Sequence, residues 1–210
     1  QGPGKSGLPE RATVKRELEQ KLKAMKNEGA TLDVITFSGN GEPTLHPEFE
    51  GIIDDTIELR DKYFPGVKIS VLCNSTRLDR DDVCRALTKV DNNILKLDSA
   101  ITATMRRIDR PNSPTFTSEG VIEQIAGFGS QCIVQTMMLR GEHEGQKIDN
   151  TTDEEVDALI KAYRRIGPRE VMLYSLDRKT PAEHLQKVPK EELEQIADRI
   201  RANGIKVEVA

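Results

Sequence analysis

The residues with the clearest chemical potential form a glycine-rich turn, Ser38-Gly39-Asn40-Gly41-Glu42-Pro43-Thr44. Glycines at the end of a buried strand let another group approach the backbone, so that free N–H and C=O groups can bind it. Glu42 adds a carboxylate, which suits an ammonium group. The turn is not a phosphate loop, because no Gly-Lys-Ser/Thr follows and an acid would repel phosphate. A tight turn with Glu42 near a helix N-terminus is the alternative that composition leaves open.

Three further polar residues are predicted to lie at strand ends, namely Asn74, Asp98 and Tyr174. Each has hydrogen-bonding groups that suit a sugar or a base. Singly, each is more often a turn former or a satisfied buried polar group. Together they gain weight, because the carboxyl ends of parallel strands are where α/β proteins bind ligands.

Arginines cluster in the segment 105–112, which is predicted to be a connection between a strand and a helix. The guanidinium group binds carboxylate or phosphate groups through paired N–H donors. Arg110 in this segment, and Arg178 after a later strand, are the candidates for contacts with an anionic substrate. A solvated, charged loop is the alternative for both segments.

Histidines and cysteines give no metal-binding pattern. The three histidines are scattered, and Cys73, Cys84 and Cys132 are odd in number and widely spaced. No local iron–sulfur or zinc motif is present. A disulfide framework is also disfavoured, so a reducing cytoplasm is the expected setting.

Helical and strand-like segments alternate along the chain. Helices are predicted over residues 9–27, 47–63, 79–87, 118–128, 151–166 and 189–202, and strands over 32–37, 67–72, 94–98, 132–139, 170–175 and 205–209. Such alternation requires crossover connections and a mainly parallel sheet. Both a barrel-like (β/α) sheet and an open doubly wound sheet remain compatible with it. Residues 141–146 are predicted to be a loop, and 183–201 a solvated helix face.

Composition is typical of a single globular α/β domain over residues 1–210. The chain is 36% hydrophobic and 31% charged, which disfavours disorder and membrane-protein classes. The formal net charge of -4 argues against a broadly basic nucleic-acid surface. No apolar run reaches the length needed to span a bilayer.

Several motifs resemble those of radical S-adenosylmethionine (SAM) enzymes. Gly39-Asn40-Gly41-Glu42-Pro43-Thr44 resembles their Gly-Gly-Glu-type motif, in a form similar to the iron–sulfur oxidoreductase branch that includes the wybutosine-synthesis tRNA enzymes. Cys73-Asn74-Ser75, Lys96-Leu97-Asp98-Ser99-Ala100, Ile108-Asp109-Arg110-Pro111 and the stretch 174–178 resemble later segments of the same barrel. The resemblance therefore implies a partial (β/α) barrel with a mainly parallel sheet.

The resemblance also implies roles for individual residues. Gly39, Asn40, Gly41 and Glu42 would bind the methionine amino group of SAM, with Pro43 shaping the turn. Asn74 and Asp98 would lie near the ribose or carboxylate, and Leu139 and Tyr174 near the adenine. No side chain is predicted to be a catalytic acid or a radical relay.

One family element is not found in this sequence. The family binds a [4Fe–4S] cluster through a Cys-x3-Cys-x2-Cys loop after its first strand, and the resemblance predicts that both lie upstream of Gln1. A reductant such as flavodoxin or ferredoxin would then supply the electron. The alternatives are a cluster-free SAM- or nucleotide-binding module, a tRNA-modifying enzyme, which the acidic charge disfavours, and a metal-free barrel enzyme such as an aldolase.

Overall fold

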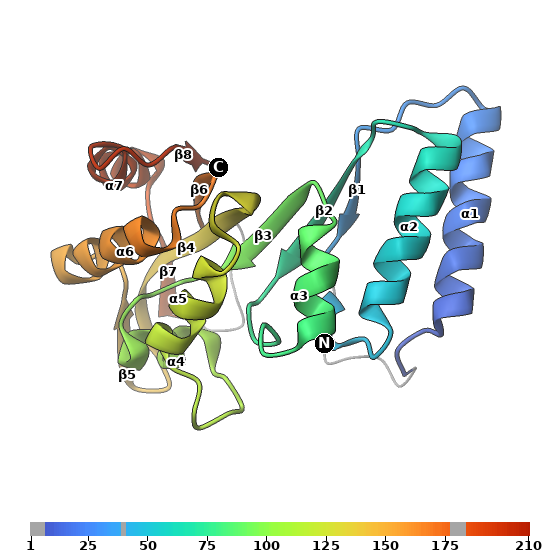
Figure 1. Ribbon diagram of the computed structural model, residues 1–210. Helices are drawn as coiled ribbons and strands as arrows, with labels where there is room; N and C mark the ends of the chain where they lie inside the picture. The colour runs from blue at the N-terminus through green and yellow to red at the C-terminus, as the bar shows by residue number, and fades with distance from the viewer. Residues whose placement is uncertain (1–6, 39–40, 177–183) are drawn as a thin grey trace. The chain divides into compact units, whose positions relative to one another are not determined.

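The structure is a computed structural model that describes residues 7–38, 41–176 and 184–210. Contacts within the chain divide it into two compact units, Gln1–Asn93 and Ile94–Ala210 (Figure 1). The predicted site residues are shared between the units. Gly41, Glu42 and Asn74 belong to the first unit, whereas Asp98 and Tyr174 belong to the second.

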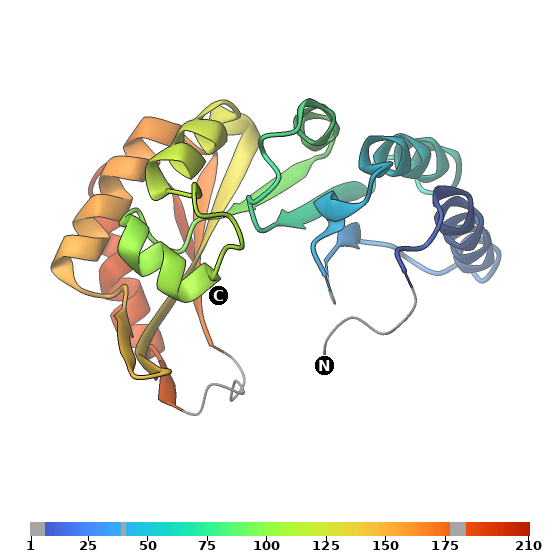
Figure 2. The same cartoon turned by 90° about the horizontal axis from the view of Figure 1, so that it is seen from below.

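The first unit consists of two parallel strands covered by helices. Its elements are α1 (Arg11–Asn27), β1 (Val34–Phe37), the 3-10 turn η1 (Pro43–Leu45), α2 (Phe49–Tyr63), β2 (Lys68–Cys73) and α3 (Asp81–Thr88). Val34 is paired with Lys68, and Phe37 with Val71. The helices lie on one face of the strands (Figure 2), where Phe49, Ile53 and Ile69 are almost completely buried. This core fixes the point at which the chain leaves β1 and β2.

The second unit has a parallel sheet with an antiparallel extension. Its strands are β4 (Cys132–His143), β5 (Gln146–Asp149), β6 (Glu170–Ser175), β7 (His184–Lys187) and β8 (Val207–Val209). Its helices are α4 (Thr102–Asp109), α5 (Ser118–Ala126), α6 (Asp153–Ile166) and α7 (Lys190–Arg201), with the 3-10 turn η2 (Gly129–Gln131) before β4. Strands β4, β6 and β8 are parallel, while β5 and β7 pair with the far half of β4 in the antiparallel direction.

Strand β3 (Asn92–Lys96) contains the boundary between the units. The Asn92 side chain donates a hydrogen bond to Ser70 Oγ in the first unit, and the Leu97 N–H donates to Gln135 O in the second. The strand order is β1-β2-β3-β4-β6-β8. The fold is therefore α/β with a mainly parallel sheet, as predicted, and the described part of the sheet is not closed.

Local sequence signals set the helix ends. Helix α6 begins after Thr152, whose hydroxyl accepts from the Glu155 N–H, and it ends at Gly167 with φ 63°. A side-chain acceptor at the start and a left-handed glycine at the end satisfy backbone groups that the helix itself leaves unpaired. None of the described helices is long and apolar enough to cross a membrane.

Three predicted segments differ from the structure. Residues 105–112 were predicted to be a connection, but most of them belong to helix α4, which ends at Asp109. Residues 141–146 were predicted to be a loop, but they belong to the β4–β5 hairpin. Strand β7 lies in the segment 183–201, which was predicted to be helical, and only its later part forms α7.

Gly141 is required where β7 pairs with β4, opposite Leu185. Its φ is 138°, and an added Cβ would lie 2.1 Å from the His184 carbonyl oxygen. We expect Gly141→Ala to lower the free energy of unfolding by about 2 kcal/mol or more, because strain and overpacking act together. Urea unfolding measures this change. Gly204→Ala is the control, since Gly204 has φ 76° with no atom near its added Cβ, and equal losses in both variants would contradict the account.

Candidate functional site

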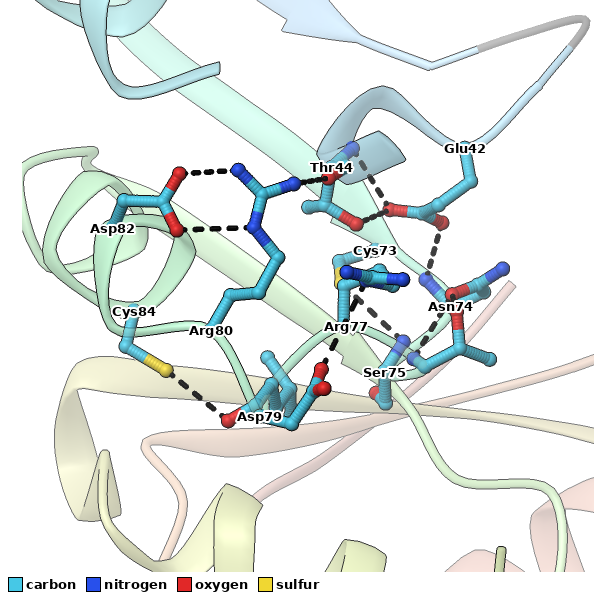
Figure 3. Close-up of polar contacts among 12 residues, drawn as sticks. Glu42, Thr44, Cys73, Asn74, Ser75, Arg77, Asp79, Arg80, Asp82 and Cys84 are labelled. Atoms are coloured by element: carbon cyan, nitrogen blue, oxygen red, sulfur yellow. Dashed lines mark hydrogen bonds and ion pairs between the residues drawn. The ribbon is translucent and has the colours of Figure 1, made fainter. Parts of the chain in front are cut away.

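Glu42 lies between β1 and η1, as the N-cap of η1, and is held by hydrogen bonds at both carboxylate oxygens (Figure 3). Oε1 accepts from the Thr44 N–H at 3.2 Å and from Thr44 Oγ1 at 2.5 Å. Oε2 accepts from the Asn74 N–H at 2.7 Å, at the end of β2. A carboxylate has about four acceptor positions, so these three bonds orient Glu42 and leave capacity for one further N–H donor.

Asn74 is brought to Glu42 by its backbone, while its side chain orders the turn that follows. Asn74 Oδ1 accepts from Thr76 N at 3.0 Å and from Thr76 Oγ1 at 2.6 Å. The next residue, Ser75, has φ 64°, an uncommon conformation for a residue with a Cβ. The structure therefore brings the Glu42 carboxylate and the Asn74 backbone together. Gly41 and Pro43 flank Glu42, whereas Gly39 and Asn40 lie outside the described residues.

Two arginines that the sequence reasoning did not single out also lie in this region. Arg80 forms an ion pair with Asp82 and donates to the Thr44 carbonyl at 3.5 Å (Figure 3). Arg77 Nε is buried without a hydrogen-bond partner, and it lies 3.8 Å from Asp79 Oδ1. A buried guanidinium nitrogen of this kind attracts an anionic acceptor. The only signal in the sequence was their position just after a strand end.

In the second unit, Asp98 is the centre of a buried charge group. Its side chain is 0% exposed, Oδ1 accepts from the Met137 N–H, and Oδ2 lies 2.6 Å from Lys96 Nζ. Lys96 also contacts Asp109 Oδ1 at 3.1 Å, so one ammonium group serves two carboxylates. Burial raises the pKa of Asp98 above its ordinary value, and Lys96 opposes that rise. Burial alone would lower the pKa of Lys96, but Asp98 and Asp109 together raise it.

Asn150 connects the predicted residues of this unit, although sequence reasoning missed it. Its side chain is buried and donates to the carbonyls of Asp98 and Met137, while its oxygen accepts from the Leu139 N–H. This places the ends of β3 and β4 in register. Leu139 is 1% exposed. Tyr174 on β6 is opposite Met137, and burial, followed by the charge of Asp98, raises its pKa to about 12.

Of the two predicted substrate residues, Arg110 lies in the described part of the chain. Arg110 is the C-cap of α4, with φ 48°, and it pairs with Glu144 at 2.9 Å. Arg178 lies outside the described residues. Neither prediction is tested by these contacts.

The cysteines of this chain do not form a site for an iron–sulfur cluster. Cys73 and Cys132 are buried, and Cys84 is half-buried. In the described ranges, no three His, Cys, Asp or Glu side chains are arranged to hold a metal ion. Cluster ligands are deprotonated thiolates, whereas burial and then Glu42 raise the pKa of Cys73 far above its usual value, and burial raises the pKa of Cys132 to about 11.

Thiol labelling checks that Cys73 and Cys132 are buried, protonated thiols. In the native protein at pH 8, we expect Cys84 to react with a disulfide reagent at least about tenfold faster than Cys73 and Cys132, because exposed thiolate is the reactive form. All three should react in denaturant. Cys84→Ser supplies the control, since it should remove the fast phase. A native protein that labels rapidly at three thiols would contradict the assignment.

Comparison with known proteins gives a consistent family match. The profile of the Radical SAM superfamily matches residues 3–149. A protein named GTPase Obg from Brachyspira hyodysenteriae (strain ATCC 49526 / WA1) is 28% identical over 197 residues, which are 92% of this chain and 27% of that protein. UPF0026 protein slr1464 of Synechocystis sp. (strain ATCC 27184 / PCC 6803 / Kazusa) is 31% identical over 71% of this chain and 52% of its own length. The chain thus spans about half or less of these curated relatives.

Solved structures share the fold. A domain of pyruvate-formate lyase-activating enzyme from Bacteroides vulgatus ATCC 8482 aligns with a TM-score of 0.61 and 18% identity, over 84% of this chain and 98% of that domain. A structure of TYW1 with a lysine-pyruvate adduct bound aligns with a TM-score of 0.59 and 17% identity, over 92% of this chain and 60% of that structure. At these identities the likeness concerns the fold alone.

Proposed function

Because the chain belongs to the radical SAM superfamily, we propose that it forms the SAM-binding part of an enzyme that uses SAM for radical chemistry. That chemistry is the reductive cleavage of SAM to methionine and a 5′-deoxyadenosyl radical, which abstracts hydrogen from a substrate. The [4Fe–4S] cluster would be bound by cysteines outside this chain. The contribution of the chain itself is to bind and orient SAM.

The observation that carries the proposal is the oriented carboxylate of Glu42. Its three hydrogen bonds to Thr44 and Asn74 hold both oxygens in place before a ligand arrives. Such preorganisation favours binding, because less conformational freedom is lost when the ligand enters. In the proposal, the remaining acceptor position of Glu42 takes an N–H of the methionine ammonium group, and the backbone of Gly41 borders the same group.

The other contacts are proposed from their positions at strand ends. The guanidinium group of Arg77, whose Nε lies 3.8 Å from Asp79 Oδ1 without a hydrogen bond, would receive the methionine carboxylate with Asn74 beside it. In the second unit, Asp98 would act near the ribose through the groups that it orders, since its own carboxylate is buried and already bonded. Leu139 and Tyr174 would border the adenine.

Arg110 is proposed to contact the substrate, and Arg178 is the further candidate for this role. An anionic substrate, a flavodoxin- or ferredoxin-type reductant and a cytoplasmic setting complete the proposal. Support comes from the charge of the guanidinium groups and from the family match rather than from a bound ligand.

The test uses the gene product that contains this chain, reconstituted anaerobically with iron and sulfide. We expect a broad visible absorption that dithionite bleaches, as for a redox-active cluster with cysteine ligands, and formation of 5′-deoxyadenosine from SAM. SAM binding without such absorption would favour the cluster-free SAM-binding module. Absence of both would contradict the proposed function.

A further inference from the structure

A cavity lined by arginines lies between α4 and the β4–β5 hairpin, within the second unit. Its volume is about 290 Å³. The lining side chains are Arg106, Arg107, Arg110, Glu144, Gln146 and Ile148. Three guanidinium groups therefore face one carboxylate, one amide and one apolar side chain.

The nearby acid of α4 does not neutralise these arginines. Asp109 stands between Arg107 and Arg110 in sequence, but its carboxylate is paired with Lys96. Among the described residues that line the cavity, Glu144 is the one carboxylate. The cavity thus keeps a positive charge in a chain whose formal net charge is -4.

The three arginines are held to different degrees. Arg106 Nη1 donates to the carbonyls of Ser113 at 3.1 Å and Phe116 at 3.0 Å, so its position is fixed by backbone. Arg107 makes a single long hydrogen bond, at 3.4 Å, to the Lys147 carbonyl. Arg107 and Arg110 are exposed. The guanidinium group of Arg106 is therefore held in place by the backbone, whereas Arg107 and Arg110 have N–H donors available to a ligand.

The ion pair between Arg110 and Glu144 is made by two residues with unusual backbone conformations. Arg110 has φ 48° and Glu144 has φ 51°, in the left-handed region that is unfavourable for residues with a Cβ. Glu144 and Gly145 form a two-residue hairpin loop in which both φ values are positive, where Asn is preferred at the first position. An exposed ion pair of this kind adds little stability.

We propose that this arginine cavity binds the phosphate group of a small phosphate monoester. A phosphate dianion offers three oxygens to paired guanidinium donors and would compete with Glu144 for Arg110. The side-chain amide of Gln146 would donate to the ester oxygen of the ligand, and Ile148 forms the apolar part of the cavity lining. The volume is near the lower limit of small-ligand sites, about 300 Å³, which favours a compact ligand over a nucleic-acid backbone.

The inference that the phosphate monoester is a substrate rests on the proposed function. The inference that the cavity binds phosphate does not depend on it. The test therefore omits SAM. Inorganic phosphate and glycerol 3-phosphate are titrated into the full chain by calorimetry, in chloride buffer of constant ionic strength. We expect saturable binding that Arg107→Ala and Arg110→Ala each weaken by about tenfold or more, as for loss of a charge-assisted hydrogen bond.

Two further variants make the test specific. Glu144→Gln should strengthen phosphate binding several-fold, because it removes the competing carboxylate. Arg164→Ala is the matched control, since Arg164 is exposed on α6 and does not line the cavity. Binding of glycerol 3-phosphate should weaken below about pH 6, where the monoester dianion takes up a proton.

The result that would overturn the proposal is equally direct. No saturable binding of either phosphate probe, an equal loss in Arg164→Ala, or binding of a short RNA with none of the monoester would each contradict it. Thermal unfolding of every variant verifies that the fold is retained. SAM binding is measured separately. Loss of phosphate binding with normal SAM binding would contradict the phosphate site and leave the proposed function supported. Loss of SAM binding with normal phosphate binding would contradict the proposed function and leave the phosphate site supported.

Discussion

Glu42→Gln is expected to weaken SAM binding by about 10- to 100-fold. The substitution removes the negative charge that faces the ammonium group, and one charge-assisted hydrogen bond is worth about 1.5–3 kcal/mol. It also places a donor group at Oε1 or Oε2, where Thr44 and Asn74 already donate, so the turn loses one internal bond. Calorimetric titration of SAM into the wild-type and variant chains measures the loss.

Two further variants separate charge from position. Glu48→Gln changes an exposed carboxylate six residues later and should leave SAM affinity unchanged. Thr44→Val keeps the charge of Glu42 but removes the 2.5 Å hydroxyl bond that orients it, so we expect a smaller loss, of about threefold to tenfold. Equal affinity in Glu42→Gln and Glu48→Gln would remove Glu42 from the site.

Lys96→Met is expected to lower the free energy of unfolding by about 3 kcal/mol, because it leaves a buried carboxylate without its cation. Asp98 is 0% exposed and lies 2.6 Å from Lys96 Nζ. The double variant Lys96→Met/Asp98→Asn should recover most of the loss, since Asn keeps an acceptor for the Met137 N–H. Lys161→Met, at an exposed position of α6, serves as the control in the same urea unfolding experiment.

The loss in Lys96→Met should depend on pH. Burial raises the folded-state pKa of Asp98 above its unfolded value of about 3.9, and Lys96 is the main group that limits this rise. Without Lys96 the folded state holds the Asp98 proton more tightly than the unfolded state does, so stability falls as pH rises above about 4. We therefore expect a larger loss at pH 8 than at pH 4.5. A loss that is the same at both values would show that packing rather than charge is responsible.

The parallel α/β core was predictable because its strands and helices carry strong apolar periodicity. Strand β2, helix α6 and strand β6 lie within about two residues of their predicted ranges. Helix α4 was missed because it is only eight residues long and its arginines beside Pro111 were interpreted as a charged connection. The β4–β5 hairpin was missed because Glu144, rather than Asn, occupies the turn.

The candidate site was predictable where position along a strand decides it. Glu42 and Asn74 follow adjacent parallel strands, and the structure places the Asn74 N–H 2.7 Å from Glu42. The role of Asn150 was not predictable, because its three hydrogen bonds reach β3 and β4 from a residue after β5. Arg77 lacked any pattern of its own. Such residues are recognised only when tertiary contacts show which polar groups they satisfy.

The most direct test of the central claim compares SAM with 5′-methylthioadenosine, which keeps the nucleoside but lacks the amino acid. If Glu42 binds the amino acid end, the wild-type chain should bind SAM about tenfold or more tightly than 5′-methylthioadenosine, and Glu42→Gln should lower this ratio by about tenfold or more. If the ratio is the same in both proteins, the carboxylate after β1 does not recognise SAM.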